Sequence, residues 1–143
     1  MIDKTPKYWT GDSPDDITEW LHEYTEEPSL EIHPVLCRNC KNDALEARID
    51  GDEGVVQIIC PECKTKKILL DGEEIWSECH PKKRKCIVCK NNRFNIRVGF
   101  IRRDNGDVKW VYIGERCTQC GTLASYADWN VNFGPTAEME QNI

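Results

Sequence analysis

The spacing of the cysteines constrains this chain more than any other feature. Nine of the 143 residues are cysteine, and eight of them form four pairs whose members are separated by two residues. The pairs are Cys37/Cys40, Cys60/Cys63, Cys86/Cys89 and Cys117/Cys120. Two thiolates at this spacing can bind one ion from a tight turn, and two such turns complete the tetrahedron that zinc prefers. The spacing therefore predicts two four-cysteine sites that bind two zinc ions.

The intervals between the pairs indicate which pairs share an ion. Nineteen residues (41–59) separate the first two pairs and 27 residues (90–116) separate the last two. Each interval fits one β-hairpin, so we expect one site from the first two pairs and one from the last two. Iron or an iron–sulfur cluster is the alternative to zinc. Redox catalysis by a Cys-x-x-Cys pair is the other alternative. It requires a single pair at the start of a helix, and an arrangement of four pairs does not resemble that motif.

Three further residues carry chemistry that could belong to these sites. Cys79 and His80 adjoin the basic stretch 82–85, and His33 lies four residues before Cys37. Either Cys79 or His80 could replace one of the eight ligands. The simpler interpretation is that Cys79 is a small buried side chain and that His33 lies at the surface.

Composition limits the fold class and the cellular environment. Hydrophobic residues make up 39% of the chain and charged residues 31%, which favours a small domain stabilised by metal over one with a large apolar core. The apolar run at 55–59 is too short to span a membrane. The first residues lack the apolar core of a secretory signal. We expect a cytoplasmic protein with no membrane partner.

Residues 1–36 form an acidic segment with one expected helix. They contain nine acidic residues and two lysines. Ser13 and Pro14 are typical of the N-cap and first position of a helix, and apolar residues at helical spacing follow over about 14–27. This short amphipathic helix could dock on a hairpin, or it could be a detachable arm that binds a basic partner.

Residues 37–78 are expected to form a first zinc ribbon. Strands at 44–50 and 55–60 would pair Ile49 with Val56 and Ala47 with Ile58. Residues 66–70 would add a third strand. The basic residues of 79–85 would then link this unit to the next.

Residues 86–133 are expected to form a second zinc ribbon. Asn105-Gly106 is a strong hairpin signal, and as a two-residue loop it places Phe100 opposite Val111 and Val98 opposite Ile113. The other face of this hairpin collects the candidate contact residues Arg97, Arg103, Trp110, Tyr112 and Arg116. Such a face could bind nucleic acid, bind a partner protein or pack internally. Residues 134–143 have no core-forming pattern and are expected to be a mobile tail.

Two successive four-cysteine hairpins over about residues 37–133 resemble tandem zinc ribbons. Their layout is similar to that of the small two-ribbon subunit of RNA polymerases and of the related transcript-cleavage factors. The resemblance implies a mostly β, metal-stabilised fold. Cleavage factors carry adjacent acidic residues at the hairpin tip, whereas the tip here is Asp104-Asn105-Gly106-Asp107, so cleavage activity does not transfer to this chain.

The sequence favours a binding protein over an enzyme. Two closed sets of four cysteines leave no open position for a catalytic water, and no phosphate-binding loop or hydrolase motif is present. Eight thiolates add eight negative charges and two zinc dications add four positive ones, so the formal net charge of −6 becomes −10. We therefore expect a zinc-binding adaptor with a protein partner and no small-molecule substrate. Nucleic-acid binding in a transcription-associated protein is the alternative, and enzymatic activity is a minor one.

Overall fold

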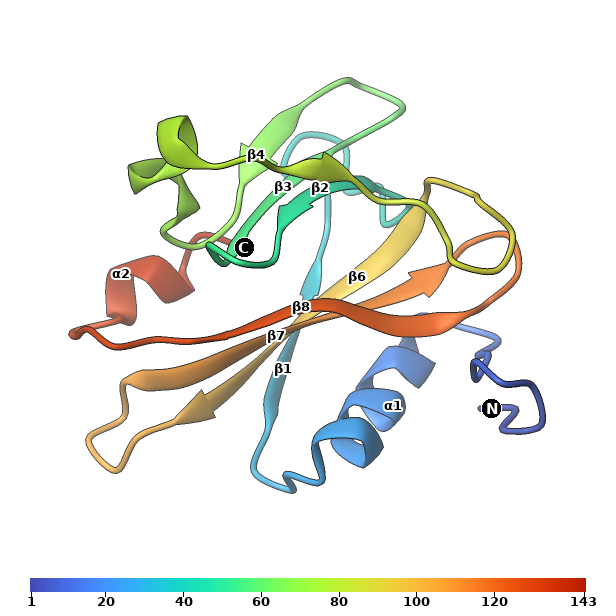
Figure 1. The fold of residues 1–143 in the computed structure, drawn as a ribbon, viewed down its shortest axis with the longest axis horizontal. Helices are drawn as coiled ribbons and strands as arrows, with labels where there is room; N and C mark the ends of the chain where they lie inside the picture. Colours follow the sequence, from blue (N-terminus) through green and yellow to red (C-terminus); the bar gives the residue numbers. More distant parts are fainter.

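The computed structural model describes all residues from 1 to 143 and has three layers (Figure 1). The elements in chain order are α1 (Asp15–Thr25), β1 (Glu31–Val35), β2 (Glu46–Asp50), β3 (Val55–Ile59), β4 (Lys66–Ile68), η1 (Gly72–Glu74), η2 (Trp76–Glu78), β5 (Lys82–Lys83), β6 (Phe94–Arg102), β7 (Val108–Cys117), β8 (Leu123–Asn130) and α2 (Ala137–Glu140). The strands form two four-stranded sheets, in the orders β1-β6-β7-β8 and β4-β3-β2-β5. The fold is therefore mostly β with an N-terminal helix, as the sequence predicts.

Both predicted hairpins are present with the predicted register along their strands. Ile49 pairs with Val56 in the first hairpin and Phe100 pairs with Val111 in the second. The prediction of a two-residue loop in the second hairpin is wrong by one residue. The loop has three residues, 104–106, and is closed by the Arg103 N–H donating to the Asp107 carbonyl at 2.7 Å. A bulge between Ile101 and Arg102 then restores the predicted register.

The main core lies between the two sheets. Alternate residues of each strand face inward because successive side chains of a strand point to opposite sides. The cluster joins apolar side chains from both hairpins to the first cysteine of every pair. Each of these four cysteines is at most 2% exposed. The two Cys-x-x-Cys turns of each half are thus anchored in one continuous core.

Helix α1 covers the other face of the β6-β7 hairpin (Figure 1). Its apolar stripe is buried through Ile17 and Leu21. Gly114 of β7 permits this approach, because a Cβ atom there would lie 2.8 Å from a methyl group of Leu21. The helix begins at Asp15, and Pro14 takes the N-cap position that the sequence assigned to Ser13. No side chain caps the first turn; the Asp16 carboxylate instead accepts the N–H groups of Asp12 and Ser13, which precede the helix.

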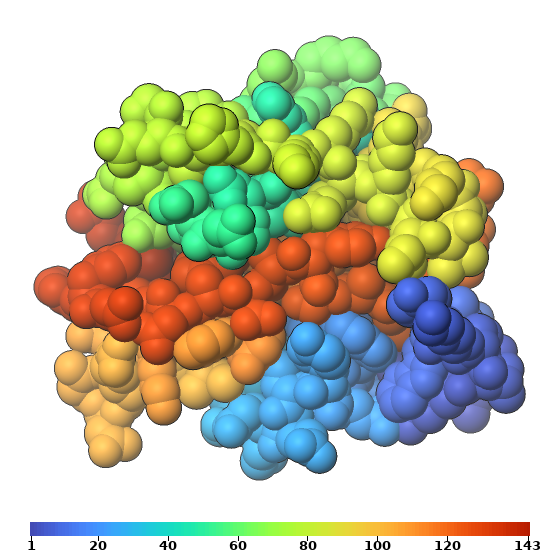
Figure 2. All heavy atoms as spheres, viewed as in Figure 1, coloured from blue at the N-terminus to red at the C-terminus, as the bar shows by residue number.

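Two segments are more ordered than the sequence indicates. Residues 134–143, expected to be a mobile tail, contain α2 and bury Met139 to 7% exposure. Asn142 fixes this segment to the first half of the chain, since its side chain donates to the carbonyls of Ile68 and Leu70. The expected linker 79–85 contains β5, which pairs with β2. Figure 2 shows the C-terminal part of the chain running as a band between the first hairpin and the N-terminal segment.

The second half of the chain repeats the strand pairing of the first. Pro34 of β1 pairs with Arg97 of β6, and Lys83 of β5 pairs with Arg48 of β2. An offset of 49 positions relates Pro34 to Lys83 and Arg48 to Arg97. Each half therefore supplies the edge strand of the other half's sheet, and the two halves are related by a pseudo-twofold rotation.

The hairpins and third strands follow the same repeat. Ile58 of β3 pairs with Lys67 of β4, and Glu115 of β7 pairs with Ala124 of β8. These two pairs are related by an offset of 57 positions. The offset exceeds 49 because the second hairpin is eight residues longer than the first. Glu115 consequently occupies the position of a buried isoleucine in the first half.

No helix of the structure has both the length and the apolar composition that crossing a membrane requires.

Candidate metal centres and aromatic surface

The structure gathers the eight paired cysteines into two groups of four. The first group is Cys37, Cys40, Cys60 and Cys63, and the second is Cys86, Cys89, Cys117 and Cys120. Within each group the four sulfur atoms lie within 4.8 Å of one another. The groups match the pairing that the hairpin intervals predict.

The distances between sulfur atoms fit a tetrahedral metal site. Sγ–Sγ separations of 3.4 Å (Cys37–Cys63) and 3.5 Å (Cys89–Cys117) are close to the edge of about 3.8 Å expected for a tetrahedron with metal–sulfur bonds of about 2.3 Å. They exceed the disulfide bond length of about 2.05 Å, and all nine cysteines are free. The residues present therefore fit a four-thiolate metal ion in each group.

One turn geometry is used four times to present these thiols. We call each six-residue turn that starts at the first cysteine of a pair a knuckle; the knuckles are 37–42, 60–65, 86–91 and 117–122. In each one the first residue's N–H donates to the sixth residue's carbonyl, and the fifth residue's N–H donates to the first residue's carbonyl, at 2.7–2.9 Å. The fifth residue has a φ between 65° and 78°. Glycine suits this conformation, but only the last knuckle has a glycine, Gly121, at this position. The other three knuckles have a lysine there, and the closing hydrogen bonds hold it in the same conformation.

Side chains at the sixth knuckle position donate to the sulfurs in a repeated pattern. The Asn42 amide reaches Cys60 Sγ at 3.6 Å, and the Asn91 amide reaches Cys117 Sγ at 3.4 Å. Both asparagines lie in the first knuckle of their site and act on the second. N–H donors of this kind stabilise thiolates and orient ligands around a metal.

The threonines at the same position of the second knuckles act on their own cysteines. The Thr65 hydroxyl lies 3.2 Å from Cys63 Sγ, and the Thr122 hydroxyl lies 3.0 Å from Cys120 Sγ. Hydrogen bonds from Thr65 lower the pKa of Cys63 to about 5. A thiol that ionises below neutral pH is prepared for metal binding.

Three other candidates lie outside both groups. The Cys79 thiol donates to the Ile75 carbonyl at 3.1 Å, and burial raises its pKa. The backbone N–H of His80 donates to Asp50, and the His33 ring contacts Glu31 at 2.8 Å. The structure gives none of them a position at a four-cysteine group.

The three candidate arginines of the second hairpin make contacts within the chain. Arg97 donates to Asp15 and Thr18 of α1 at 2.8 and 2.7 Å. Arg116 donates to the Gly11 carbonyl, and Arg103 donates to the Val131 carbonyl. The arginines therefore hold α1 and the neighbouring segments on the sheet, which corresponds to the internal-packing interpretation.

The two candidate aromatic residues belong to a row that crosses from β7 to α1. The ring of Trp110 lies 6.5 Å from that of Tyr112, which meets Tyr24 edge-on at 6.5 Å. Tyr24 in turn stacks on Trp20 with ring centroids 4.8 Å apart. Tyr24 is 52% exposed, so the row reaches the surface of the helix at this residue.

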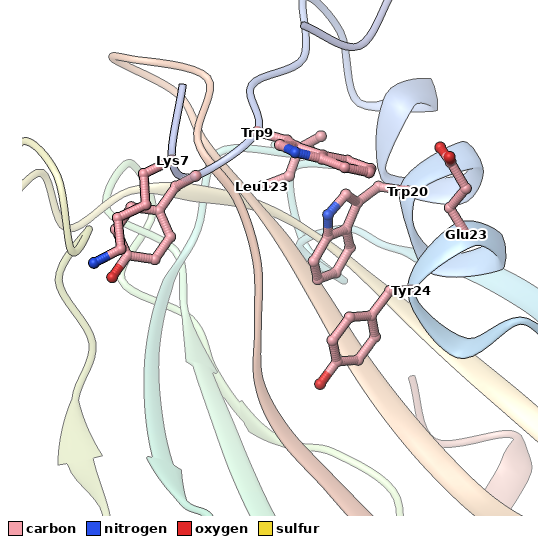
Figure 3. A pocket seen from close by; sticks show the side chains of 7 residues that line it. Lys7, Trp9, Trp20, Glu23, Tyr24 and Leu123 are labelled. Carbon is pink, nitrogen blue, oxygen red and sulfur yellow. The ribbon is translucent and has the colours of Figure 1, made fainter. Parts of the chain in front are cut away.

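A pocket opens at this end of the row (Figure 3). Its volume is about 290 Å³, and its lining residues are Lys7, Tyr8, Trp9, Trp20, Glu23, Tyr24 and Leu123. Figure 3 shows Trp9 and Trp20 side by side, with Tyr24 beyond Trp20 and Lys7 on the opposite side of the opening. Sequence reasoning did not single out Tyr8 or Trp9. Their adjacency in an otherwise acidic segment was the signal available.

Comparison with protein-family models, with curated proteins and with solved structures gave no match. The geometry of the four-cysteine groups and of the aromatic surface is therefore the basis for a functional assignment.

Proposed function

We propose that this protein is a non-enzymatic adaptor of the zinc-ribbon type, stabilised by two zinc ions, that binds a partner protein. Four thiolates complete the coordination that zinc takes in structural sites and leave no position for a reacting water. The anchoring of both groups in the main core gives the metal a role in folding. The all-sulfur, tetrahedral ligand set suits zinc or iron rather than metals that prefer oxygen ligands, and we propose zinc because closed four-cysteine sites of this kind are typical of structural zinc.

The observation that carries the binding role is the aromatic row that ends at an exposed surface of α1. We call the surface formed by residues 7–9 and α1 the N-terminal surface. Aromatic side chains are enriched in the energetically dominant parts of protein interfaces. Tyr8 and Tyr24 on this surface are 37% and 52% exposed. The acidic residues of 1–36 outnumber the lysines by seven, which favours a basic partner.

Nucleic-acid binding receives less support. The arginines of the second hairpin are committed to α1 and neighbouring backbone, and the formal charge of the chain is −6. Affinity for nucleic acid depends on neutralising phosphates with basic side chains. Titration with single-stranded and double-stranded DNA and RNA at low salt tests this alternative, for which we expect no binding.

A site-specific photo-crosslinker tests partner binding in the cells that produce the protein. We expect a crosslinker at position 24 to capture a defined partner and one at position 133 to capture none of it. Phe133 is a suitable control because it is 48% exposed and lies outside the N-terminal surface. Charge reversal at Glu19 and Glu23 should abolish the product. Identical products at both positions, or no effect of charge reversal, would overturn the proposal.

A further inference from the structure

The pocket on the N-terminal surface has walls of a kind that hold organic cations. Trp9, Trp20 and Tyr24 contribute aromatic rings, and Glu23 contributes a carboxylate. The faces of aromatic rings attract cations, with tryptophan the strongest. Trp20 and Tyr24 stack on each other with ring centroids 4.8 Å apart and an interplanar angle of 12°, so each ring covers one face of the other.

The chain itself shows that this surface accepts an ammonium group. The Lys4 ammonium lies 4.8 Å from the centroid of the Trp9 ring and 2.6 Å from the Glu23 carboxylate. One aromatic residue and the one acidic residue of the pocket therefore already share a cation. Lys4 itself is not one of the residues that line the pocket.

The polarity of the lining distinguishes between types of cation. Five of the seven lining residues are hydrophobic, so few acceptors are available for the three N–H donors of an unmodified ammonium. Leaving such donors unpaired is costly. A methylated ammonium keeps the charge but has fewer or no N–H groups, and its methyl groups gain from contact with the rings.

We propose that this pocket binds the methylated ammonium group of a lysine side chain in a basic segment of the partner protein. The inference rests on the proposed function and names the feature of the partner that is recognised. The acidic side chains of α1 around the pocket favour the basic residues that flank the modified lysine. An anionic ligand such as a nucleotide would meet Glu23 and the acidic helix instead.

The test uses the full metal-loaded chain and three short peptides of identical sequence. The central residue is lysine, trimethyllysine or the uncharged tert-butyl analogue of trimethyllysine, and binding is followed by tryptophan fluorescence and NMR. We expect trimethyllysine to bind about tenfold more tightly than the uncharged analogue, as a partly desolvated cation–π contact predicts. Equal affinities for these two peptides, equal affinities for lysine and trimethyllysine, or no binding would overturn the inference.

Variants locate the site. Tyr24→Ala should abolish binding, and Phe133→Ala should leave it unchanged; both side chains are exposed, so folding is preserved. Glu23→Gln should weaken binding several-fold, whereas Glu26→Gln, at the C-cap of the same helix, should not. Lys7→Gln removes a like charge at the opening and should strengthen cation binding. Weaker binding of the trimethyllysine peptide to Lys7→Gln would overturn the proposal.

The crosslinking experiment separates the two levels of inference. Capture of a partner at position 24 together with failure of all three peptides would overturn the ligand assignment alone. Failure of both experiments would overturn the proposed function as well.

Discussion

Leu45 and Phe94 donate their backbone N–H groups to each other's carbonyls, both at 2.8 Å. They are equivalent residues of the two halves, 49 positions apart, so this reciprocal pair lies on the pseudo-twofold axis. Two side-chain contacts flank the axis symmetrically. Asn95 donates to the Asp43 carbonyl, and Asn92, the equivalent of Asp43, donates to Glu46, the equivalent of Asn95.

The exchange of edge strands predicts that neither half folds alone. A fragment of residues 79–143 lacks β1 and exposes the edge of β6, while a fragment of residues 1–78 lacks β5. Unpaired edges and half a core favour disorder or aggregation. We expect each fragment to lack a dispersed NMR spectrum and the equimolar mixture with zinc to recover that of the intact chain. Independent folding of either fragment would contradict this prediction.

Metal removal is expected to unfold the protein. The first cysteine of every pair is in the main core, so removing the ion leaves buried thiols without a partner. Chelation should abolish the cooperative thermal transition and release two zinc ions per chain, measured by a colorimetric zinc assay. Cys86→Ser should lose one ion. Cys79→Ser is the matched control and should retain both ions, since Cys79 contacts only a carbonyl.

The amide donors to the sulfurs should control how tightly the metal is held. Asn91→Ala removes the hydrogen bond to Cys117 Sγ, and loss of such contacts typically lowers metal affinity about tenfold or more. Competition with a chromogenic chelator measures the change. Asn42→Ala should have the same effect at the other site. Asn105→Ala, in the hairpin loop, is the control, and an equal effect there would contradict the assignment.

The ion pairs of Arg102 predict a defined pH dependence. Arg102 donates to both oxygens of Glu31 at 2.8 and 3.1 Å, and these bonds lower the pKa of Glu31 to about 2. A lowered pKa stabilises the fold above the unfolded-state pKa of 4.5, and this contribution is lost as the pH falls toward 2. The Glu31 side chain is 41% exposed, so we expect Glu31→Gln to cost roughly 0.5–1 kcal/mol at pH 7.

Denaturant unfolding of wild type and Glu31→Gln in excess zinc measures this difference. It should be present at neutral pH, shrink below pH 4.5 as Glu31 becomes protonated, and decrease in high salt. A difference that keeps growing below pH 4.5 would contradict the predicted sign.

Glu115 is expected to stabilise the second sheet although it is only 1% exposed. Burial raises its pKa, and the Tyr126 N–H and Arg84 oppose that rise. The irregular pairing of β7 with β8 leaves the Tyr126 N–H without a strand partner, and one Glu115 oxygen accepts it at 3.2 Å. Glu115→Leu should cost about 1–3 kcal/mol because it orphans this donor, whereas Glu115→Gln should cost less. Thermal unfolding that shows a more stable leucine variant would contradict this account.

The sequence was sufficient to predict the two hairpins and the grouping of cysteines. Alternation and the Asn-Gly signal placed Val98 opposite Ile113, and the structure confirms this. Local rules could do so because each hairpin pairs residues that are close in the chain. They could not find β1, which contains Pro34 and pairs with a strand about 60 residues away.

The sequence also identified a mixed arginine and aromatic face without showing what covers it. Periodicity indicates which residues share a face. Long-range packing decides which segment of the chain covers that face. Gly114 was a usable signal, since a strand residue without a side chain suggests close approach of another element. The repeated Cys-x-x-Cys-Lys-Asn of 37–42 and 86–91 was a stronger one, because it points to the repeat and so to strand exchange.

The symmetry of the strand exchange bears on ancestry. Contacts that map onto themselves under a twofold rotation are the contacts that close a homodimer. A gene that encodes one half of the present chain would therefore yield a chain able to pair with its own copy. Tandem duplication of such a gene would give the present topology with no new interface. Once fused, the halves could diverge separately, which accounts for an isoleucine at position 58 and a glutamate at position 115.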